Sequence, residues 1–139
     1  MNNFIFENSS KVYFGEGCVK EYLSNILSAY GNTVMLCYGG GSIKKNGIYD
    51  EVITVLKKEN KAVVEFSGIP SNPTYSKVLE GVKLAKESNA DLILAVGGGS
   101  VMDCCKAISL GAKYDGNIWA DFWARPGVID FEPLPLGII

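Results

Sequence analysis

The sequence contains no histidine among its 139 residues. Zinc and non-haem iron sites are usually built with imidazole ligands, and many serine and cysteine nucleophiles depend on a histidine base. The absence therefore excludes Ser–His and Cys–His pairs and argues against a zinc or iron centre within this chain. A magnesium site made of carboxylates alone stays open, although the Asp and Glu residues are scattered without a compact motif.

Cysteine is scarce and lacks the spacing of a metal cluster. The four cysteines are Cys18, Cys37, Cys104 and Cys105, and no pair has the Cys-x-x-Cys spacing. The neighbours at 104 and 105 would point to different faces of a helix. We therefore expect buried, reduced thiols rather than a metal site.

Long apolar runs and an excess of positive charge are also missing. No segment is long enough to cross a bilayer, and the N-terminus lacks the basic region and apolar run of a signal peptide. The 13 Lys and Arg residues against 15 Asp and Glu residues give no basic footprint for nucleic acid. We expect no membrane or nucleic-acid partner and a cytoplasmic location. A hydrophobic content of 47% suits one domain, residues 1–139, with a real core.

An apolar run that stops at three glycines and a serine occurs twice. Residues 92–96 lead into Gly97–Ser100, and residues 34–38 lead into Gly39–Ser42. Each pattern predicts a buried strand, a tight turn and a helix start, where unpaired N–H groups and the positive dipole end face outward. Residues without Cβ let an anion approach the backbone, so both turns predict phosphate binding. Neither has the spacing of a strict dinucleotide fingerprint or a Walker loop. Tight turns that use glycine only for backbone geometry are the alternative.

Strand and helix periodicities alternate along most of the chain. Repeated strand–helix units with short connections predict an α/β fold with a Rossmann-like parallel sheet flanked by helices. We predict strands at residues 11–14, with residues 3–6 as a candidate partner, and at 33–38, 62–66, 91–96 and 134–139. We predict helices at residues 19–30 and 48–59, a helix capped by Thr74 that carries Val78, Leu79, Val82 and Ala85, a helix at 100–112 and a short one within 116–123.

Three loops follow predicted strands directly: Gly39–Ser42, Pro70–Pro73 and Gly97–Ser100. In parallel sheets, ligands bind beyond the carboxyl ends of the strands. We therefore expect the three loops to gather at one edge of the sheet and to form a ligand site there.

The last six residues, Leu134–Ile139, form an apolar run that nothing polar follows. A natural domain rarely ends on a bare hydrophobic strand. The run predicts a strand that lacks cover within this chain, and with it a truncated or partial domain prone to self-association, including homo-oligomers.

Taken in order, these motifs resemble the N-terminal domain of the iron-containing (group III) alcohol dehydrogenase family, above all its NADPH-dependent butanol dehydrogenase-like branch. The matching residues are Lys11–Gly15, Tyr38–Gly47, Pro70–Pro73, Val96–Asp103 and Asp115–Trp119. The resemblance implies a dehydroquinate synthase-like α/β domain and an oxidoreductase that interconverts alcohols and aldehydes with a nicotinamide cofactor. It also implies Fe or Zn, held by one Asp and three His in a helical C-terminal domain that this chain lacks. The absence of histidine agrees with that.

The resemblance also implies roles for single residues. Gly98, Gly99 and Ser100 resemble the pyrophosphate-binding turn of the family, and Asn72 resembles a residue near the adenosine part of the cofactor. Asp103 resembles an aspartate close to the cofactor and substrate cleft. A carboxylate that merely benefits from the helix dipole is the alternative for Asp103.

The resemblance also implies that the first glycine turn determines whether the chain binds NAD or NADP. Relatives that use NAD carry an acidic residue after this strand, where it binds the ribose hydroxyls. Here Gly40 and Gly41 carry no charge and Ser42 adds a hydrogen-bond donor, which favours the 2′-phosphate of NADP. Lys44 and Lys45 add positive potential, although they fit equally well as solvated charges at a helix start.

Two other interpretations remain open. One is a stand-alone nucleotide-binding module without catalysis. The other is a relative of glycerol dehydrogenase or dehydroquinate synthase, which share this architecture. The Tyr38–Ser42 loop and the Gly116–Trp119 segment favour the butanol dehydrogenase-like branch. On every interpretation the chain offers binding residues and no catalytic residue or metal ligand of its own.

Overall fold

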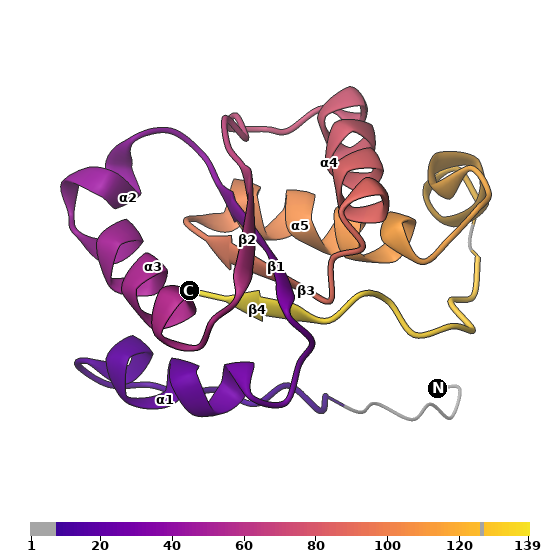
Figure 1. Cartoon of the computed structure of the whole chain (residues 1–139). Coiled ribbons are helices and arrows are strands. Elements are labelled where there is room, and N and C mark those ends of the chain that lie inside the picture. The colour runs from indigo at the N-terminus through magenta and orange to yellow at the C-terminus, as the bar shows by residue number, and fades with distance from the viewer. Residues whose placement is uncertain (1–7, 126) are drawn as a thin grey trace, which may run out of the picture.

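The computed structural model, which describes residues 8–125 and 127–139, contains a four-stranded parallel sheet between two layers of helices (Figure 1). The strand order is β2-β1-β3-β4, and all three strand pairs are parallel. The strands are β1 (Thr33–Tyr38), β2 (Ala62–Phe66), β3 (Leu92–Val96) and β4 (Leu136–Ile138). One face packs against α1 (Cys18–Leu27) and α3 (Ile48–Lys58), and the other against α4 (Tyr75–Glu87) and α5 (Gly99–Ala112). The predicted parallel α/β fold is confirmed.

The central strands β1 and β3 supply both halves of the core. Side chains alternate across a strand, so Leu36 packs toward α1 and α3, whereas Met35 packs toward α4 and α5. Every residue of β3 is buried. Because helices cover both faces, these strands are continuous apolar runs, which explains why the sequence predicted them well.

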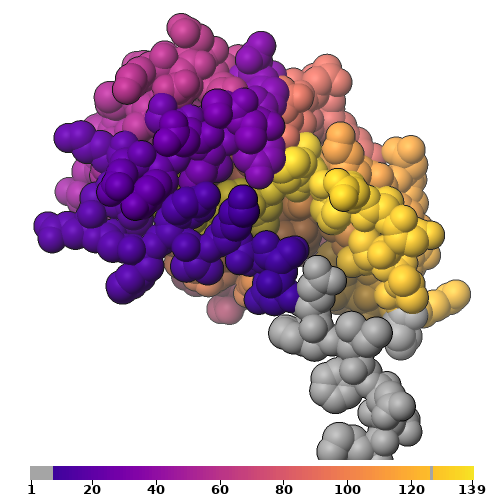
Figure 2. Space-filling view, turned by 90° about the horizontal axis from the view of Figure 1, so that it is seen from below, coloured from indigo at the N-terminus to yellow at the C-terminus, as the bar shows by residue number. Residues whose placement is uncertain are grey.

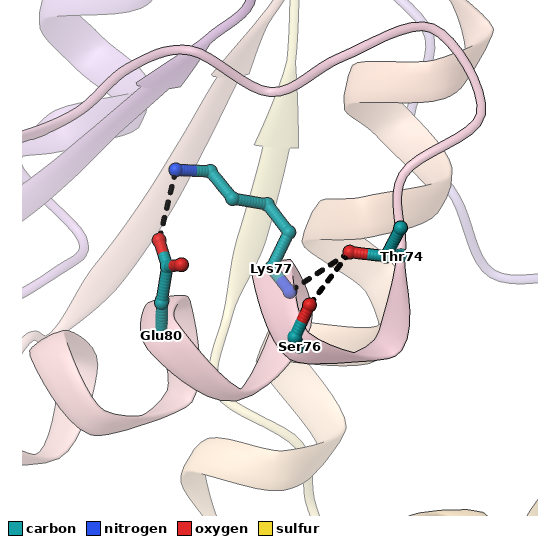
Figure 3. A network of polar contacts seen from close by, with 4 residues as sticks. All are labelled: Thr74, Ser76, Lys77 and Glu80. Atoms are coloured by element: carbon teal, nitrogen blue, oxygen red, sulfur yellow. Dashed lines mark hydrogen bonds and ion pairs between the residues drawn. The ribbon is translucent and has the colours of Figure 1, made fainter.

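Helix α4 begins at the side-chain cap predicted from the sequence. Thr74 Oγ1 accepts a hydrogen bond from the Lys77 backbone N–H at 3.3 Å and lies 2.9 Å from Ser76 Oγ (Figure 3). The Lys77 ammonium pairs with Glu80 at 3.0 Å. The cap satisfies one of the unpaired N–H groups of the first turn and fixes where the loop after β2 becomes a helix.

The strand predicted at residues 11–14 is wrong. The segment is irregular, and the side chains of Val12 and Phe14 are 83% and 98% exposed. A run with high β-propensity becomes a strand only where another strand offers it a free edge, and no strand in the described part of the chain pairs with it. Its candidate partner, residues 3–6, lies outside the described residues.

The helical region after the first glycine turn is divided in two. A short helix, α2 (Ser42–Lys45), precedes α3, and Gly47 between them has a left-handed backbone with φ of 84°. Glycine adopts this conformation without the penalty that a Cβ would bring. The break changes the direction of the chain and sets where the first turns of α2 and α3 lie.

The structure also differs from the predictions in smaller ways, at the ends of helices and in which side chains a helix buries. Helix α1 ends at Leu27, and turns rather than helix continue to Tyr30. Leu79 is 45% exposed although the apolar pattern of its helix included it. Within the predicted helix 116–123, the structure has the five-residue π-helix η1 (Trp119–Trp123).

The apolar C-terminal run is covered better than expected. Leu134 is buried, its N–H donates to the Ser109 carbonyl oxygen at 3.0 Å, and its own carbonyl accepts from Ser109 Oγ at 2.5 Å. Leu136 packs with the α4–α5 half of the core and Ile139 with the α1–α3 half, whereas Ile138 is 46% exposed. Figure 2 shows this yellow segment at the surface between indigo and orange parts of the chain. The expectation of an uncovered strand is therefore wrong for Leu134, Leu136 and Ile139.

The four cysteines are free thiols, and the predicted burial is confirmed for three of them but is wrong for Cys18. Cys37, Cys104 and Cys105 are buried and Cys18 is partly exposed. Burial raises the pKa of the Cys104 thiol to about 11. No helix in the described residues is long and apolar enough to span a membrane.

Candidate functional site

The three loops singled out in the sequence meet at the carboxyl edge of the sheet. The Gly68 N–H, in the loop after β2, donates to the Gly39 carbonyl in the loop after β1 at 3.0 Å. The Asn72 N–H donates to Ser100 Oγ at the start of α5 at 3.3 Å. The predicted gathering of the loops is confirmed, and it follows from the parallel strands, whose carboxyl ends share one edge.

The second glycine turn presents the N-terminus of a long helix. Gly98 is the N-cap of α5 and has no side chain to cap the helix, so its first-turn N–H groups lack the usual side-chain acceptor. A Cβ at Gly98 or Gly99 would meet no described atom within 4 Å. The backbone here is open to a ligand, and the helix dipole favours a negatively charged one.

The first glycine turn closes tightly at one position and is open at the next two. A Cβ at Gly39 would lie 3.1 Å from the Ile69 carbonyl oxygen, so a side chain there would push the loops apart. A Cβ at Gly40 or Gly41 would meet no described atom within 4 Å. The exposed Ser42 begins α2, and the four positions carry no charge.

A groove of about 510 Å³ runs between the two turns. It is lined by Ser42, Ile43, Asn46, Ile48, Glu51, Val96, Gly97, Gly98 and Ile139. Two of the predicted site residues, Ser42 and Gly98, therefore line the same groove although they lie 56 positions apart in the sequence. The volume of the groove lies within the range of small-molecule sites, and the groove is open to solvent on one side.

Two polar residues of this groove were not predicted. Asn46 Oδ1 accepts from the Ile48 N–H at 3.2 Å, which leaves the amide NH₂ of Asn46 as a donor. Glu51 is half-buried in the first turn of α3. Their position depends on the break between α2 and α3, which the turn dipeptide Asn46-Gly47 marks in the sequence.

The other predicted site residues lie near the groove without lining it. Asn72 is joined to Ser100 and has a left-handed backbone with φ of 57°. The Asp103 carboxylate, on α5, pairs with Lys106 at 3.2 Å, and both side chains are mostly exposed. Such a surface ion pair contributes little to stability.

Lys44 belongs to a cluster with Tyr38, Tyr49 and Glu65, none of which is among the residues that line the groove. The phenol groups of Tyr38 and Tyr49 donate to the two carboxylate oxygens of Glu65 at 2.5 and 2.6 Å. The Lys44 ammonium lies 5.3 Å from the centre of the Tyr38 ring and 4.6 Å from that of Tyr49, where cation–π attraction holds it. Lys44 and Lys45 do not line the groove, so its positive potential is smaller than the sequence suggested.

The hydrogen bonds of this cluster shift the pKa values of its members. The two phenol donors hold the pKa of the Glu65 carboxyl below its ordinary value. The bond to Glu65 is the largest cause that raises the pKa of Tyr49, to about 12. Burial first, and the bond to Glu65 second, raise the pKa of Tyr38. The cluster ties the end of β1 and the start of α3 to the edge strand β2.

The part of the chain that the structure describes shows no site for Fe or Zn. No group of three or more metal-ligating side chains is found in residues 8–125 and 127–139, and the sequence has no histidine. The residues present do not fit the metal that the resemblance implied.

A parallel sheet with two open glycine turns at its carboxyl edge defines an α/β domain suited to a phosphate-bearing cofactor. A sequence model of the family described as "Iron-containing alcohol dehydrogenase" matches residues 9–139. The chain belongs to this family.

Individual relatives agree with the family assignment. The chain is 46% identical over 139 residues to the probable NADH-dependent butanol dehydrogenase 2 of Bacillus subtilis, covering 100% of this chain and 35% of that protein. It is 41% identical over 118 residues to the NADPH-dependent aldehyde reductase YqhD of Escherichia coli, covering 85% of this chain and 30% of that protein.

The fold matches as well. The crystal structure of NADH-dependent butanol dehydrogenase A from Thermotoga maritima superposes with a TM-score of 0.86 and 42% identity, over 99% of this chain and 34% of that chain. The chain thus spans about a third of the length of these relatives. That share is the size of one domain in a longer protein, as the resemblance to an N-terminal domain implied.

Proposed function

We propose that the chain is the NADP(H)-binding part of a metal-dependent, butanol dehydrogenase-like enzyme that interconverts primary alcohols and aldehydes. The observation that carries the proposal is the groove shared by the two glycine turns, which is lined by Ser42 of the first turn and by Gly97 and Gly98 of the second. An extended dinucleotide has two anionic centres, its pyrophosphate and its 2′-phosphate, and each turn suits one of them.

The pyrophosphate is assigned to the second turn. First-turn N–H groups of α5, from Gly99 and Ser100, donate to its oxygens, and the helix dipole stabilises its charge. The Ser100 hydroxyl already accepts from the Asn72 N–H, so its own proton remains available for the ligand. Asn72 is assigned to the adenosine side, and Asp103 to the substrate side of the cofactor.

The 2′-phosphate is assigned to the first turn. Gly40 and Gly41 leave space and contribute no negative charge, and Ser42 offers a hydroxyl donor. A carboxylate after this strand would instead accept from the ribose hydroxyls of NAD. The names of the relatives include both NADH and NADPH, so the preference for NADP(H) rests on this geometry.

In such an enzyme, the bound cofactor supplies or accepts the hydride. The residues of this chain bind the cofactor and orient it at the sheet edge. The ligands of a metal that polarises the alcohol oxygen would have to come from beyond these 139 residues, because the sequence lacks histidine.

Calorimetric titration of the chain with NADP⁺ and NAD⁺ tests the proposal. We expect both to bind, NADP⁺ more tightly. Gly98→Val should weaken both by about tenfold or more, because it fills the space assigned to the pyrophosphate. The Gly98 backbone (φ −79°, ψ −174°) is one that valine adopts readily, so the variant should fold. A chain that binds neither cofactor, or a Gly98→Val variant with unchanged affinities, would contradict the proposal.

A further inference from the structure

The charged side chain among the residues that line the groove is Glu51. It sits in the first turn of α3 and is half-buried. Its carboxylate makes no hydrogen bond or ion pair with other residues in the described part of the chain. A half-buried carboxylate without a partner, in the wall of a ligand groove, is free to act on what enters the groove.

Lys44 and Lys45 of α2 do not line the groove, and neither forms an ion pair with Glu51 among the described residues. The Lys44 ammonium is held over the rings of Tyr38 and Tyr49. The negative charge that it interacts with there is the Glu65 carboxylate. The other polar groups of the lining, Ser42 and Asn46, are neutral. Among the side chains that line the groove, Glu51 therefore carries the negative charge, and the described lining contains no cationic side chain to balance it.

We propose that Glu51 is a specificity-determining residue that opposes binding of the 2′-phosphate. The inference rests on the proposed function, because it assigns the 2′-phosphate to the turn that contains Ser42, a neighbour of Glu51 in the lining. The carboxylate repels a phosphate that enters this part of the groove, where water screens the charges only partly. It accepts hydrogen bonds from an unphosphorylated ribose diol at no such cost. Glu51 therefore reduces the factor by which NADP(H) binds more tightly than NAD(H), a difference that Gly40 and Ser42 create.

The test compares Glu51→Gln with Asp50→Asn by calorimetric titration of both cofactors. The two variants remove the same charge from neighbouring positions of the same helix turn, but Asp50 is exposed and does not line the groove. We expect Glu51→Gln to lower the Kd of NADP⁺ by about five- to tenfold relative to that of NAD⁺. Asp50→Asn should move this ratio by less than about twofold.

Two further readouts separate a charge effect from a change of shape. Glu51→Asp keeps the charge and should stay closer to the unmodified chain than Glu51→Gln does. The effect of Glu51→Gln should also shrink as ionic strength rises, because salt screens repulsion between partly exposed charges. A purely steric role of Glu51 would show no such salt dependence.

The outcomes distinguish this inference from the proposed function. If both cofactors bind and Glu51→Gln leaves the ratio of Kd values unchanged, or Asp50→Asn changes it equally, the role of Glu51 is wrong while the proposed function stands. If the unmodified chain binds neither cofactor, the proposed function fails and the role of Glu51 fails with it.

Discussion

Gly40 is the position where one side chain should change the choice of cofactor. A Cβ there meets no described atom within 4 Å, and its backbone is not left-handed, so Asp fits without strain. We expect Gly40→Asp to weaken NADP⁺ relative to NAD⁺ by about 1–3 kcal/mol, because a carboxylate repels the 2′-phosphate and accepts from the ribose hydroxyls. Titration of both cofactors against both proteins measures the difference.

Gly40→Asn is the matched control, since it adds nearly the same volume without the charge. It should shift the ratio of the two affinities much less than Gly40→Asp. Equal affinities of the unmodified chain for NADP⁺ and NAD⁺ would contradict our interpretation that the first glycine turn favours the 2′-phosphate.

The Tyr49–Glu65 hydrogen bond should make stability depend on pH in two directions. The hydrogen bonds from Tyr38 and, second, from Tyr49 lower the pKa of Glu65 from its ordinary 4.5 on folding. The share that Tyr49 contributes is therefore present above pH 4.5 and is lost as the pH falls through the lowered value. Folding raises the pKa of Tyr49 from 10.0 to about 12, so the contribution is present below pH 10 and is lost as the pH rises toward 12.

We therefore expect Tyr49→Phe to lower the free energy of unfolding by about 1 kcal/mol near pH 7. The difference from the unmodified chain should shrink below pH 4 and above pH 11. Urea denaturation at several pH values measures it. Tyr30→Phe is the control, because Tyr30 is exposed and its hydroxyl makes no hydrogen bond among the described residues. A Tyr49→Phe effect that is constant across pH would contradict the role of the bond.

At the scale of helices and strands, α4 and α5 approach each other at Gly81. A Cβ there would overlap the side chain of Ile108, which is fully buried, and would lie 3.1 Å from the Phe66 ring. Alanine normally stabilises a helix by about 1 kcal/mol relative to glycine. Here the overlap should dominate, because a filled core has little room to move.

Gly81→Ala should therefore destabilise the fold by about 1–3 kcal/mol, measured by chemical denaturation. The double variant with Ile108→Val provides the control, because valine lacks the Cδ1 methyl that the new Cβ would meet. In that background the loss caused by Gly81→Ala should be smaller, giving a favourable coupling energy. Additive losses would show that the two residues do not compete for the same space.

The sequence predicted elements well where local patterns settle the outcome. β1 and β2 have the predicted bounds, because each is a short β-prone run between turn residues. Segment 11–14 has a similar composition, yet it is no strand, since pairing depends on a partner that local sequence does not reveal. The start of α3 at Ile48 agrees with the predicted helix 48–59, but the bounds of the short helix α2 before Gly47 were not predicted.

The same distinction holds for the site. The gathering of the three loops was predictable, because parallel strands place their carboxyl ends together. Glu51 was not, because its place in the groove depends on how α2 and α3 are joined at Gly47 and on where β3 and Ile139 lie. Lys44 was predicted to add positive potential near the ligand, but only the structure shows the two tyrosine rings that hold it elsewhere.

On the scale of the whole molecule, we expect the chain to bind the cofactor without catalysing hydride transfer. The groove, the two glycine turns and the α5 N-terminus all lie at one sheet edge of this chain. Hydride transfer to or from an alcohol also needs the alkoxide charge to be stabilised, and in this family a metal is expected to do so. The sequence has no histidine, and the described segments contain no group of three metal-ligating residues. On our proposal, the chain binds the cofactor and supplies no ligand for such a metal.

We therefore expect the purified 139-residue chain to bind NADP⁺ and yet show no reduction of NADP⁺ by butan-1-ol, with or without added Fe²⁺ or Zn²⁺. The butanol dehydrogenase of Thermotoga maritima, assayed under the same conditions, is the positive control. Any turnover should be retested after gel filtration and addition of a chelator, which separates activity of this chain from that of a contaminating metalloenzyme. Metal-dependent oxidation of butanol that co-elutes with the chain and disappears in Gly98→Val would show that it holds catalytic groups of its own. Binding without turnover would instead place the metal ligands and the alcohol pocket in the part of the relatives that this chain does not span.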